Sequence, residues 1–223
     1  MIGDLHCHSK LSDGSTSLED IVFYAKRAGL DVLALTDHDT MSGISRTEIL
    51  GKRYGITILP GVEISTYDEQ TGRRVHILCY LPQKPDRLAG LLARTLEERR
   101  RSGEQMIEQV TRYFPVTPEH ILRYAAASNS IYKVHIMQAL LDLGYDTAIY
   151  GSLYQELFSD KGGKCLVKTV YPKLDEVLET VRSANGVAVF AHPSVYRSMD
   201  LVKHLAPSGL IDGIEVYHPR NTP

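Results

Sequence analysis

The first thirteen residues contain two histidines and an aspartate whose types and spacing suit metal binding. His6 and His8 are two positions apart in an extended segment, and alternate side chains of a strand share one face, so both imidazoles project the same way. Asp13 follows in a Ser-Asp-Gly tripeptide. Imidazole together with carboxylate oxygen favours zinc, manganese, iron or nickel over calcium or magnesium. The segment therefore predicts hydrolysis that depends on metal ions.

Further histidines and a glutamate recur at comparable places along the chain. His38 lies in a Thr-Asp-His-Asp tetrapeptide and Glu63 in Gly-Val-Glu-Ile-Ser, and both follow predicted strands. His192 in Ala-His-Pro, and His218 before a proline, again come directly after predicted strands. Parallel α/β folds place their active sites at the carboxyl ends of the strands. We therefore expect these side chains to converge, together with His76.

The elements that must position these residues begin with an alternation of strand and helix. A capping box at Thr16 and Glu19, ahead of an amphipathic stretch that stops at Gly29, predicts the first helix. Continuous apolar runs predict strands and favour a parallel sheet or barrel covered by helices. The predicted strands are residues 2–8, 32–35, 56–59 and 75–81, with a polar-ended segment at 61–65 and a second helix at 42–54.

The pattern changes after residue 85, where one helical stretch follows another as far as about residue 157. An extended segment then returns at 164–167, followed by a helix at 174–184, a strand at 187–190, a helix at 199–205 and a strand at 211–217. The alternation is thus interrupted once. We expect a barrel in two parts, residues 1–84 and 164–223, with a helical insertion at residues 85–163 that faces the substrate.

Composition narrows the class of protein. A chain of 223 residues that is 43% hydrophobic can bury a full core, and a net charge of −2 argues against a protein that coats long nucleic acids. Three widely spaced cysteines favour neither a disulfide framework nor a thiolate zinc site. Cys7 should face away from any metal that its histidine neighbours hold. With no signal peptide and no long apolar stretch, we expect a cytoplasmic protein without a membrane partner, and we predict no protein partner.

Taken as a set, the motifs resemble those of the polymerase and histidinol phosphatase superfamily, called PHP. The chain looks most similar to the stand-alone phosphoesterases of that family that act on nucleoside 3′,5′-bisphosphates or on RNA 5′ ends. The resemblance implies a distorted (β/α)7 barrel that holds up to three ions of manganese, iron or zinc. The matching segments, in family order, are D-L-H-C-H-S-K-L-S-D-G, L-T-D-H-D, P-G-V-E-I-S, V-H-I-L, A-H-P and E-V-Y-H-P.

The resemblance also assigns ligands and a mechanism. It assigns His6 and His8 to the first ion, Asp13 and His38 to the second, His76 and His192 to the third, and Glu63 as a bridge between ions. The catalytic group that it implies is Asp13, His38, Glu63 and His192. Metal ions in such a cluster activate a water that attacks phosphorus in line with the leaving oxygen.

One part of the family pattern is missing. Relatives close the site with a G-S-D-x-H segment on a last strand, which supplies an aspartate and a histidine, and no such segment occurs before Pro223. We expect the last strand to be absent, and we favour truncation of a longer polypeptide over its loss, because an unclosed barrel exposes an edge strand. On this expectation the first and second ions each lack one protein ligand.

Substrate contacts are expected from four residues. Lys133 and His135 align with a G-R-P-H element that contacts phosphate in relatives, here with a lysine point charge in place of the bidentate arginine. Lys168 resembles another phosphate contact, and His218 should face the site from its strand end. The expected substrate is a small phosphorylated nucleotide or a short RNA end.

Three other functions compete with this one. A PHP phosphatase could act on a different small phosphomonoester, such as histidinol phosphate. A catalytically impaired PHP module could bind a metal or a partner, as some polymerase-associated versions do. Amidohydrolases also open with H-x-H on a barrel strand, but they lack S-D-G followed by T-D-H-D at this spacing, which makes them the weakest alternative.

Overall fold

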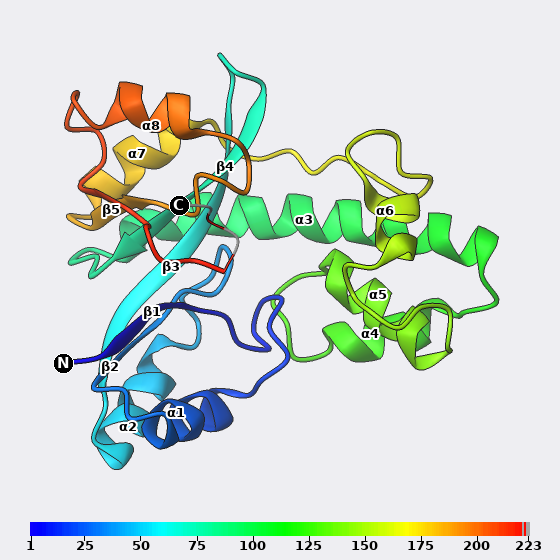
Figure 1. The fold of residues 1–223 in the computed structure, drawn as a ribbon, viewed down its shortest axis with the longest axis horizontal. Helices are drawn as coiled ribbons and strands as arrows, with labels where there is room; N and C mark the ends of the chain where they lie inside the picture. The colour runs from blue at the N-terminus through cyan, green and yellow to red at the C-terminus, as the bar shows by residue number, and fades with distance from the viewer. Residues whose placement is uncertain (220, 222–223) are drawn as a thin grey trace. The chain divides into compact units, whose positions relative to one another are not determined.

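A computed structural model describes residues 1–219 and 221. Contacts divide the chain into two compact units, one made of Met1–Thr95 with Tyr171–Pro223 and the other of Leu96–Val170. The first unit carries the sheet, and the second is built from helices (Figure 1). The expected insertion at 85–163 overlaps the second unit, and its role as a substrate-facing cap stays a prediction.

The sheet of the first unit has six strands among the described residues, arranged in chain order as a curled half-barrel. β1, β2 and the first part of β3 are parallel, whereas β4 is antiparallel to both β3 and β5, and β6 is parallel to β5. The predicted α/β fold class is confirmed. The strands are β1 (Gly3–Cys7), β2 (Val32–Leu35), β3 (Thr57–Asp68), β4 (Arg73–Tyr80), β5 (Val187–Phe190) and β6 (Gly213–Ile214).

The sheet is mixed, because β4 is antiparallel to both of its neighbours where the apolar runs favoured a parallel sheet or barrel. Only the turn at residues 69–72 separates β3 from β4, and a parallel connection needs a crossover of about a dozen residues or more. The two strands therefore form a hairpin, whose turn includes Gly72 at a φ of +68°. The predicted strand at 56–59 and the segment at 61–65 are also one element, because β3 runs through both.

β3 changes neighbours along its length. Its residues 57–60 pair with β2, and its residues 61–68 pair with β4. The change occurs at Gly61, where an added Cβ would lie 2.9 Å from the side chain of Thr36. The second half of β3 thereby extends beyond the carboxyl end of β2. This extension carries Glu63 to the level of the loop that follows β2, where His38 and Glu63 form an isolated parallel bridge.

Helices cover the sheet through two apolar clusters. One cluster joins β3, β4 and β5 to α7, α8 and the beginning of α3, and it includes Val62, Ile77 and Phe190. The other joins β2 to α1 and α2. Cys7 packs against this second cluster, as its position between two histidines predicted, and all three cysteines are free thiols. The helices are α1 (Leu18–Arg27), α2 (Ile44–Tyr54), α3 (Asp86–Tyr113), α7 (Leu174–Ser183) and α8 (Met199–Leu205).

Several predicted element boundaries are wrong. The N-cap of α1 is Ser17, which accepts a hydrogen bond from the backbone N–H of Asp20, so the helix is capped one residue later than the expected Thr16. The extended segment expected at 164–167 is instead a turn at 164–165 followed by irregular chain. The last strand, predicted at 211–217, is only Gly213–Ile214, because its partner β5 ends at Phe190 and a loop follows.

The second unit has its own apolar core. The later part of α3 packs with α4, α5 and α6 through buried residues that include Val110, Ile121, Ile136 and Phe158. Pro118 occupies the first turn of α4, where its missing N–H costs no helical hydrogen bond. The three helices that lie wholly in this unit are α4 (Pro118–Ala125), α5 (Lys133–Asp142) and α6 (Ser152–Phe158).

Candidate metal centre

Glu63 is the centre of the predicted site. Its side chain is almost fully buried, and its backbone is fixed by the loop after β2, because Glu63 N–H donates to the carbonyl of Thr36 and Asp39 N–H donates to the carbonyl of Glu63. A buried carboxylate is costly unless charged or hydrogen-bonding groups surround it. The placement of Glu63 on the extension of β3 brings such groups to it from several strand ends.

Five imidazoles meet the Glu63 carboxylate. Its Oε1 lies 2.6 Å from Nδ1 of His76 and 2.7 Å from Nε2 of His192. Its Oε2 lies 3.0 Å from Nε2 of His6, 2.9 Å from Nε2 of His8 and 3.4 Å from Nδ1 of His38. The structure therefore brings together the six residues that the sequence placed at separate strand ends or, for His76, within a strand.

Asp13 joins the same cluster from the loop after β1. Its Oδ1 lies 2.9 Å from Nδ1 of His8, and its Oδ2 lies 3.9 Å from Nε2 of His38. Asp37 fixes this loop by accepting hydrogen bonds from Ser9 N–H at 2.7 Å and from the Ser12 hydroxyl at 2.6 Å. The loop is tight enough that only a glycine fits at its end.

Gly14 is that glycine. A Cβ added there would lie 2.4 Å from the carbonyl oxygen of His8, closer than any real Cβ contact. In the loop after β2, Asp39 has a φ of 56°. Its carboxylate accepts hydrogen bonds from Ser65 N–H at 2.8 Å and from the Ser65 hydroxyl at 3.0 Å. Buried polar side chains thus hold the loops that present Asp13 and His38.

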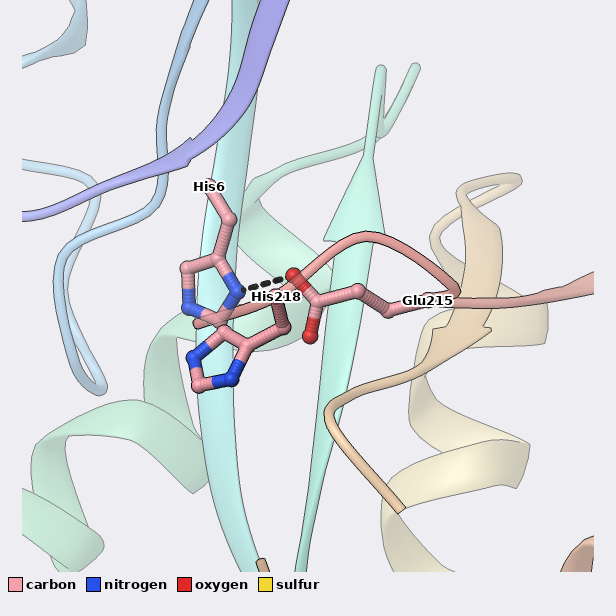
Figure 2. Close-up of side chains that lie close together, drawn as sticks. All are labelled: His6, Glu215 and His218. Carbon is pink, nitrogen blue, oxygen red and sulfur yellow. Dashed lines mark hydrogen bonds and ion pairs between the residues drawn. The ribbon is translucent and has the colours of Figure 1, made fainter. Parts of the chain in front are cut away.

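Glu215 is a site residue that the sequence analysis missed. It directly follows β6, and its Oε1 lies 2.7 Å from Nδ1 of His6, as Figure 2 shows. His218, an expected substrate residue, lies nearby, with its ring centroid 5.8 Å from that of His6 and 4.9 Å from that of His192. The signal was present, because Glu215 opens the E-V-Y-H-P segment and lies within the strand predicted at 211–217, but only its histidine was assigned a role.

The charges in the cluster depend on one another. Burial alone would raise the pKa of Glu63, but the positive charges of His38, His76 and His6 outweigh it and hold that pKa well below its usual value. Burial alone would lower the pKa of His6, but Glu63 and Glu215 outweigh it and raise this pKa to about 9. For His38, burial dominates and lowers the pKa well below the usual value. Glu63 is therefore an anion at neutral pH.

The donor set fits transition-metal ions. Three groups each gather nitrogen and oxygen atoms within 4.8 Å of one another: His6 with Glu63 and His192, His8 with His38 and Glu63, and His6 with Glu215 and His218. In addition, Nε2 of His6 and Nε2 of His8 lie 3.0 Å apart while both face the same carboxylate oxygen. Imidazole nitrogens crowded around a shared carboxylate are the ligand types that manganese, iron and zinc take.

The remaining predicted substrate residues belong to the second unit. Lys133 begins α5, and its Nζ lies 3.5 Å from the carbonyl oxygen of Phe158. His135 is buried, and its Nδ1 accepts a hydrogen bond from Tyr132 N–H at 3.2 Å, which caps the helix. Lys168 lies in an irregular segment. Their contact with a substrate stays a prediction.

Comparison with known proteins gives consistent matches. A family model described as the PHP domain matches residues 4–187. The phosphoribosyl 1,2-cyclic phosphate 1,2-diphosphodiesterase of Eggerthella lenta is 38% identical over 100% of this chain and 85% of that protein. The 5′-3′ exoribonuclease of Haemophilus influenzae is 31% identical over 86% of this chain and 69% of its own length.

Two further matches extend the range of substrates and include a solved structure. The 3′,5′-nucleoside bisphosphate phosphatase of Chromobacterium violaceum is 30% identical over 86% of this chain and 67% of that protein. The crystal structure of a metal-dependent phosphoesterase of Bifidobacterium adolescentis superposes with a TM-score of 0.88 at 29% identity, covering 99% of this chain and 79% of that one. No helix of the described residues has both the length and the apolar character that a bilayer crossing requires.

Proposed function

Since this chain belongs to the PHP family of metal-dependent phosphoesterases, we propose that its substrate is a small phosphate ester carried on a ribose. A phosphoribosyl cyclic phosphodiester is the first candidate, because the relative named for that activity matches the whole chain at 38% identity. A nucleoside 3′,5′-bisphosphate or a short RNA 5′ end is the second, supported by relatives at 30% and 31% identity.

The observation that carries the phosphoesterase proposal is the Glu63 carboxylate with imidazoles on both of its oxygens. A carboxylate whose two oxygens face different histidines can bridge two ions. We propose that the cluster holds two or three ions of manganese, iron or zinc. The ligands would be His6, His8, Asp13, His38, Glu63, His76 and His192.

When bound, such ions supply an activated water and offset the charge that develops on phosphoryl oxygens. The chain's own residues do the positioning. Asp13 contacts both His8 and His38 and so fixes the positions of these two imidazoles relative to each other. Oε1 of Glu63 likewise contacts two imidazoles, those of His76 and His192. We propose Asp13, His38, Glu63 and His192 as the group closest to the reaction.

Hydrolysis of three substrates tests this proposal, with the products separated by chromatography. A cyclic phosphodiester gives a ring-opened monoester, an RNA 5′ end gives a mononucleotide, and only a phosphomonoester gives free phosphate directly. Purified protein loaded with Mn²⁺ is assayed on phosphoribosyl 1,2-cyclic phosphate, adenosine 3′,5′-bisphosphate and a 5′-phosphorylated RNA oligonucleotide, with histidinol phosphate as the comparison. We expect kcat/KM on one of the ribose-borne esters to exceed that on histidinol phosphate by at least about tenfold, or 1.4 kcal/mol of transition-state stabilisation. Equal or higher turnover of histidinol phosphate would contradict the substrate proposal.

Metal removal tests the class of enzyme separately. We expect dialysis against a chelator to abolish hydrolysis and added Mn²⁺ to restore it. A chain that binds metal but turns over none of the substrates would instead be a binding module of the PHP fold. This outcome would leave the fold and the metal centre intact while overturning the enzymatic proposal.

A further inference from the structure

Glu215 is partly buried and uses both of its carboxylate oxygens within the site. Its Oε1 accepts a hydrogen bond from Nδ1–H of His6 at 2.7 Å (Figure 2). Its Oε2 accepts a hydrogen bond from the backbone N–H of His192, also at 2.7 Å. One side chain therefore contacts two of the imidazole-bearing residues that surround Glu63.

The contact with His6 fixes how that imidazole is used. An imidazole that binds a metal ion through one nitrogen carries a proton on the other, and a carboxylate that accepts this proton orients the ring. Nε2 of His6 faces Glu63 and His8, where the other donor atoms gather. Nδ1 faces Glu215. Glu215 thus selects the form of His6 that presents the Nε2 lone pair to the centre of the cluster.

The contact with His192 fixes a backbone that is under strain. His192 has a φ of 24°, outside the regions that a residue with a Cβ normally adopts. Such a conformation persists only where neighbouring groups hold it. The Glu215 carboxylate supplies one of these restraints at the N–H of His192, and the His192 side chain then reaches Oε1 of Glu63 at 2.7 Å.

We propose that Glu215 is a positioning residue that holds His6 and His192 in the orientation needed for metal binding, and that it is not itself a ligand. The alternative is an ion shared by His6, Glu215 and His218, whose donor atoms lie close enough together. Positioning is favoured because both Glu215 oxygens already accept short hydrogen bonds from N–H groups. The inference rests on the proposed metal centre and extends it.

The test measures metal binding rather than turnover. Variants Glu215→Gln and Glu215→Asp are compared with wild type and with Glu179→Gln, which removes the same charge from an exposed position of α7. Each metal-free protein is titrated with Mn²⁺, and the bound metal per chain is measured at saturation. An amide can accept only one of the two hydrogen bonds and places an NH₂ group against the other N–H.

We expect Glu215→Gln to bind Mn²⁺ about 10- to 100-fold more weakly than wild type, with the wild-type number of ions recovered at saturation. Glu215→Asp keeps the carboxylate on a shorter side chain, so its Mn²⁺ affinity should lie between those of wild type and Glu215→Gln. The affinity of Glu179→Gln should match that of wild type. His218→Ala should keep the number of ions unchanged. Circular dichroism of the metal-free variants checks that each is folded. If Glu215→Gln is unfolded, the Mn²⁺ affinity of Glu215→Asp alone tests the positioning role.

Each other outcome has a distinct meaning. Unchanged affinity in Glu215→Gln would overturn the positioning role while leaving the metal centre in place. Loss of one ion at saturation in both Glu215→Gln and His218→Ala would identify Glu215 as a ligand and also overturn the inference. A wild-type chain that binds no Mn²⁺, Fe²⁺ or Zn²⁺ would refute the proposed metal centre itself.

Discussion

At the scale of single residues, Glu63 shows how much of the site depends on one side chain. It is the only carboxylate in this part of the described chain that contacts imidazoles from β1, β4 and the loops after β1, β2 and β5 together. An isolated buried anion would be unstable, and the surrounding imidazoles compensate for its burial.

Replacing Glu63 by glutamine should therefore affect metal binding and stability together. We expect Glu63→Gln to lose more than about 100-fold in Mn²⁺ affinity, since it removes a proposed bridging ligand. The metal-free protein should lose about 3 kcal/mol, because breaking a buried ion pair leaves charged partners uncompensated. Titration and urea denaturation measure the two effects, with Glu179→Gln as the control. A variant with wild-type affinity would show that Glu63 is not a ligand.

The proton affinity of the histidines gives a pH dependence. The pKa of His6 is raised to about 9, and that of His8 lies well above its usual value, so both are protonated at pH 7 without metal. A metal ion must displace these protons, and its apparent affinity should rise between pH 6 and pH 9. Calorimetry in buffers of different ionisation enthalpy would detect the released protons. An affinity that is constant over this range would contradict the prediction.

The raised pKa of His6 also makes the stability of the metal-free fold depend on pH, and this stability falls as pH rises while the affinity for metal increases. A histidine whose pKa is raised in the folded state stabilises the fold fully below its unfolded pKa of 6.5, and this contribution is lost as pH rises through the folded value of about 9. The metal-free protein should therefore lose the His6 contribution across that interval. Urea midpoints measured without metal at pH 6.5 and pH 9 test whether the fold loses stability over this range. The carboxylates whose pKa is lowered stay ionised throughout it and do not contribute.

At the scale of elements, the loop after β1 is the most constrained part of the site. Gly14→Ala would place a methyl group 2.4 Å from the carbonyl oxygen of His8, so the backbone carrying Asp13 must move. We expect a loss of about 1–3 kcal/mol in stability and weaker Mn²⁺ binding.

Gly90→Ala is the matched control. Gly90 lies within α3, and an added Cβ there meets nothing within 4 Å. This substitution should stabilise the protein by about 0.5–1 kcal/mol and leave Mn²⁺ affinity unchanged. Thermal unfolding and metal titration of both variants separate a local clash from a general effect of alanine. Equal behaviour of the two variants would mean that the loop accommodates the methyl group.

The sequence predicted elements better than it predicted their pairing. Apolar runs located every strand, and the alternation of side chains predicted that His6 and His8 share a face while Cys7 points away. The hairpin of β3 and β4 was missed because buried strands read as apolar runs in either direction, and only the short turn between them distinguishes the two cases.

The candidate site was predictable in its residue types more than in its contacts. Strand-end placement identified most of the residues that meet Glu63, and the family motif added His76, but neither predicted which histidine contacts which oxygen. Glu215 was missed because a glutamate after a short strand is common on protein surfaces, and only the three-dimensional contact with His6 distinguishes it. Asp37 shows the same limit, since its hydrogen bonds to Ser9 and Ser12 join segments that are far apart in the sequence.

At the scale of the whole molecule, the family assignment expected from the motifs is confirmed, and the two units have separate apolar cores. All the proposed ligands belong to the first unit. A ligand that binds only the folded state stabilises it by about 2.7 kcal/mol at a concentration 100 times its Kd. We therefore expect metal binding to stabilise the first unit.

Hydrogen exchange with and without Mn²⁺ tests this expectation. Peptides covering β1, β3 and β5 should exchange more slowly when Mn²⁺ is present, whereas peptides covering α4 and α5 should change little. The same buffer with Ca²⁺ in place of Mn²⁺, at equal ionic strength, is the control for a general effect of divalent cations. Equal protection in both units would show that metal binding also stabilises the second unit.

The path of the chain around Glu63 has a consequence for biosynthesis. The carboxylate contacts His6, which lies 57 positions earlier, and His192, which lies 129 positions later. During translation the ribosome must therefore release most of this chain before the two sides of the centre can meet. Contacts of such long sequence separation form late and slow folding. A nascent chain that has not yet exposed His192 can therefore hold at most a partial set of the proposed ligands.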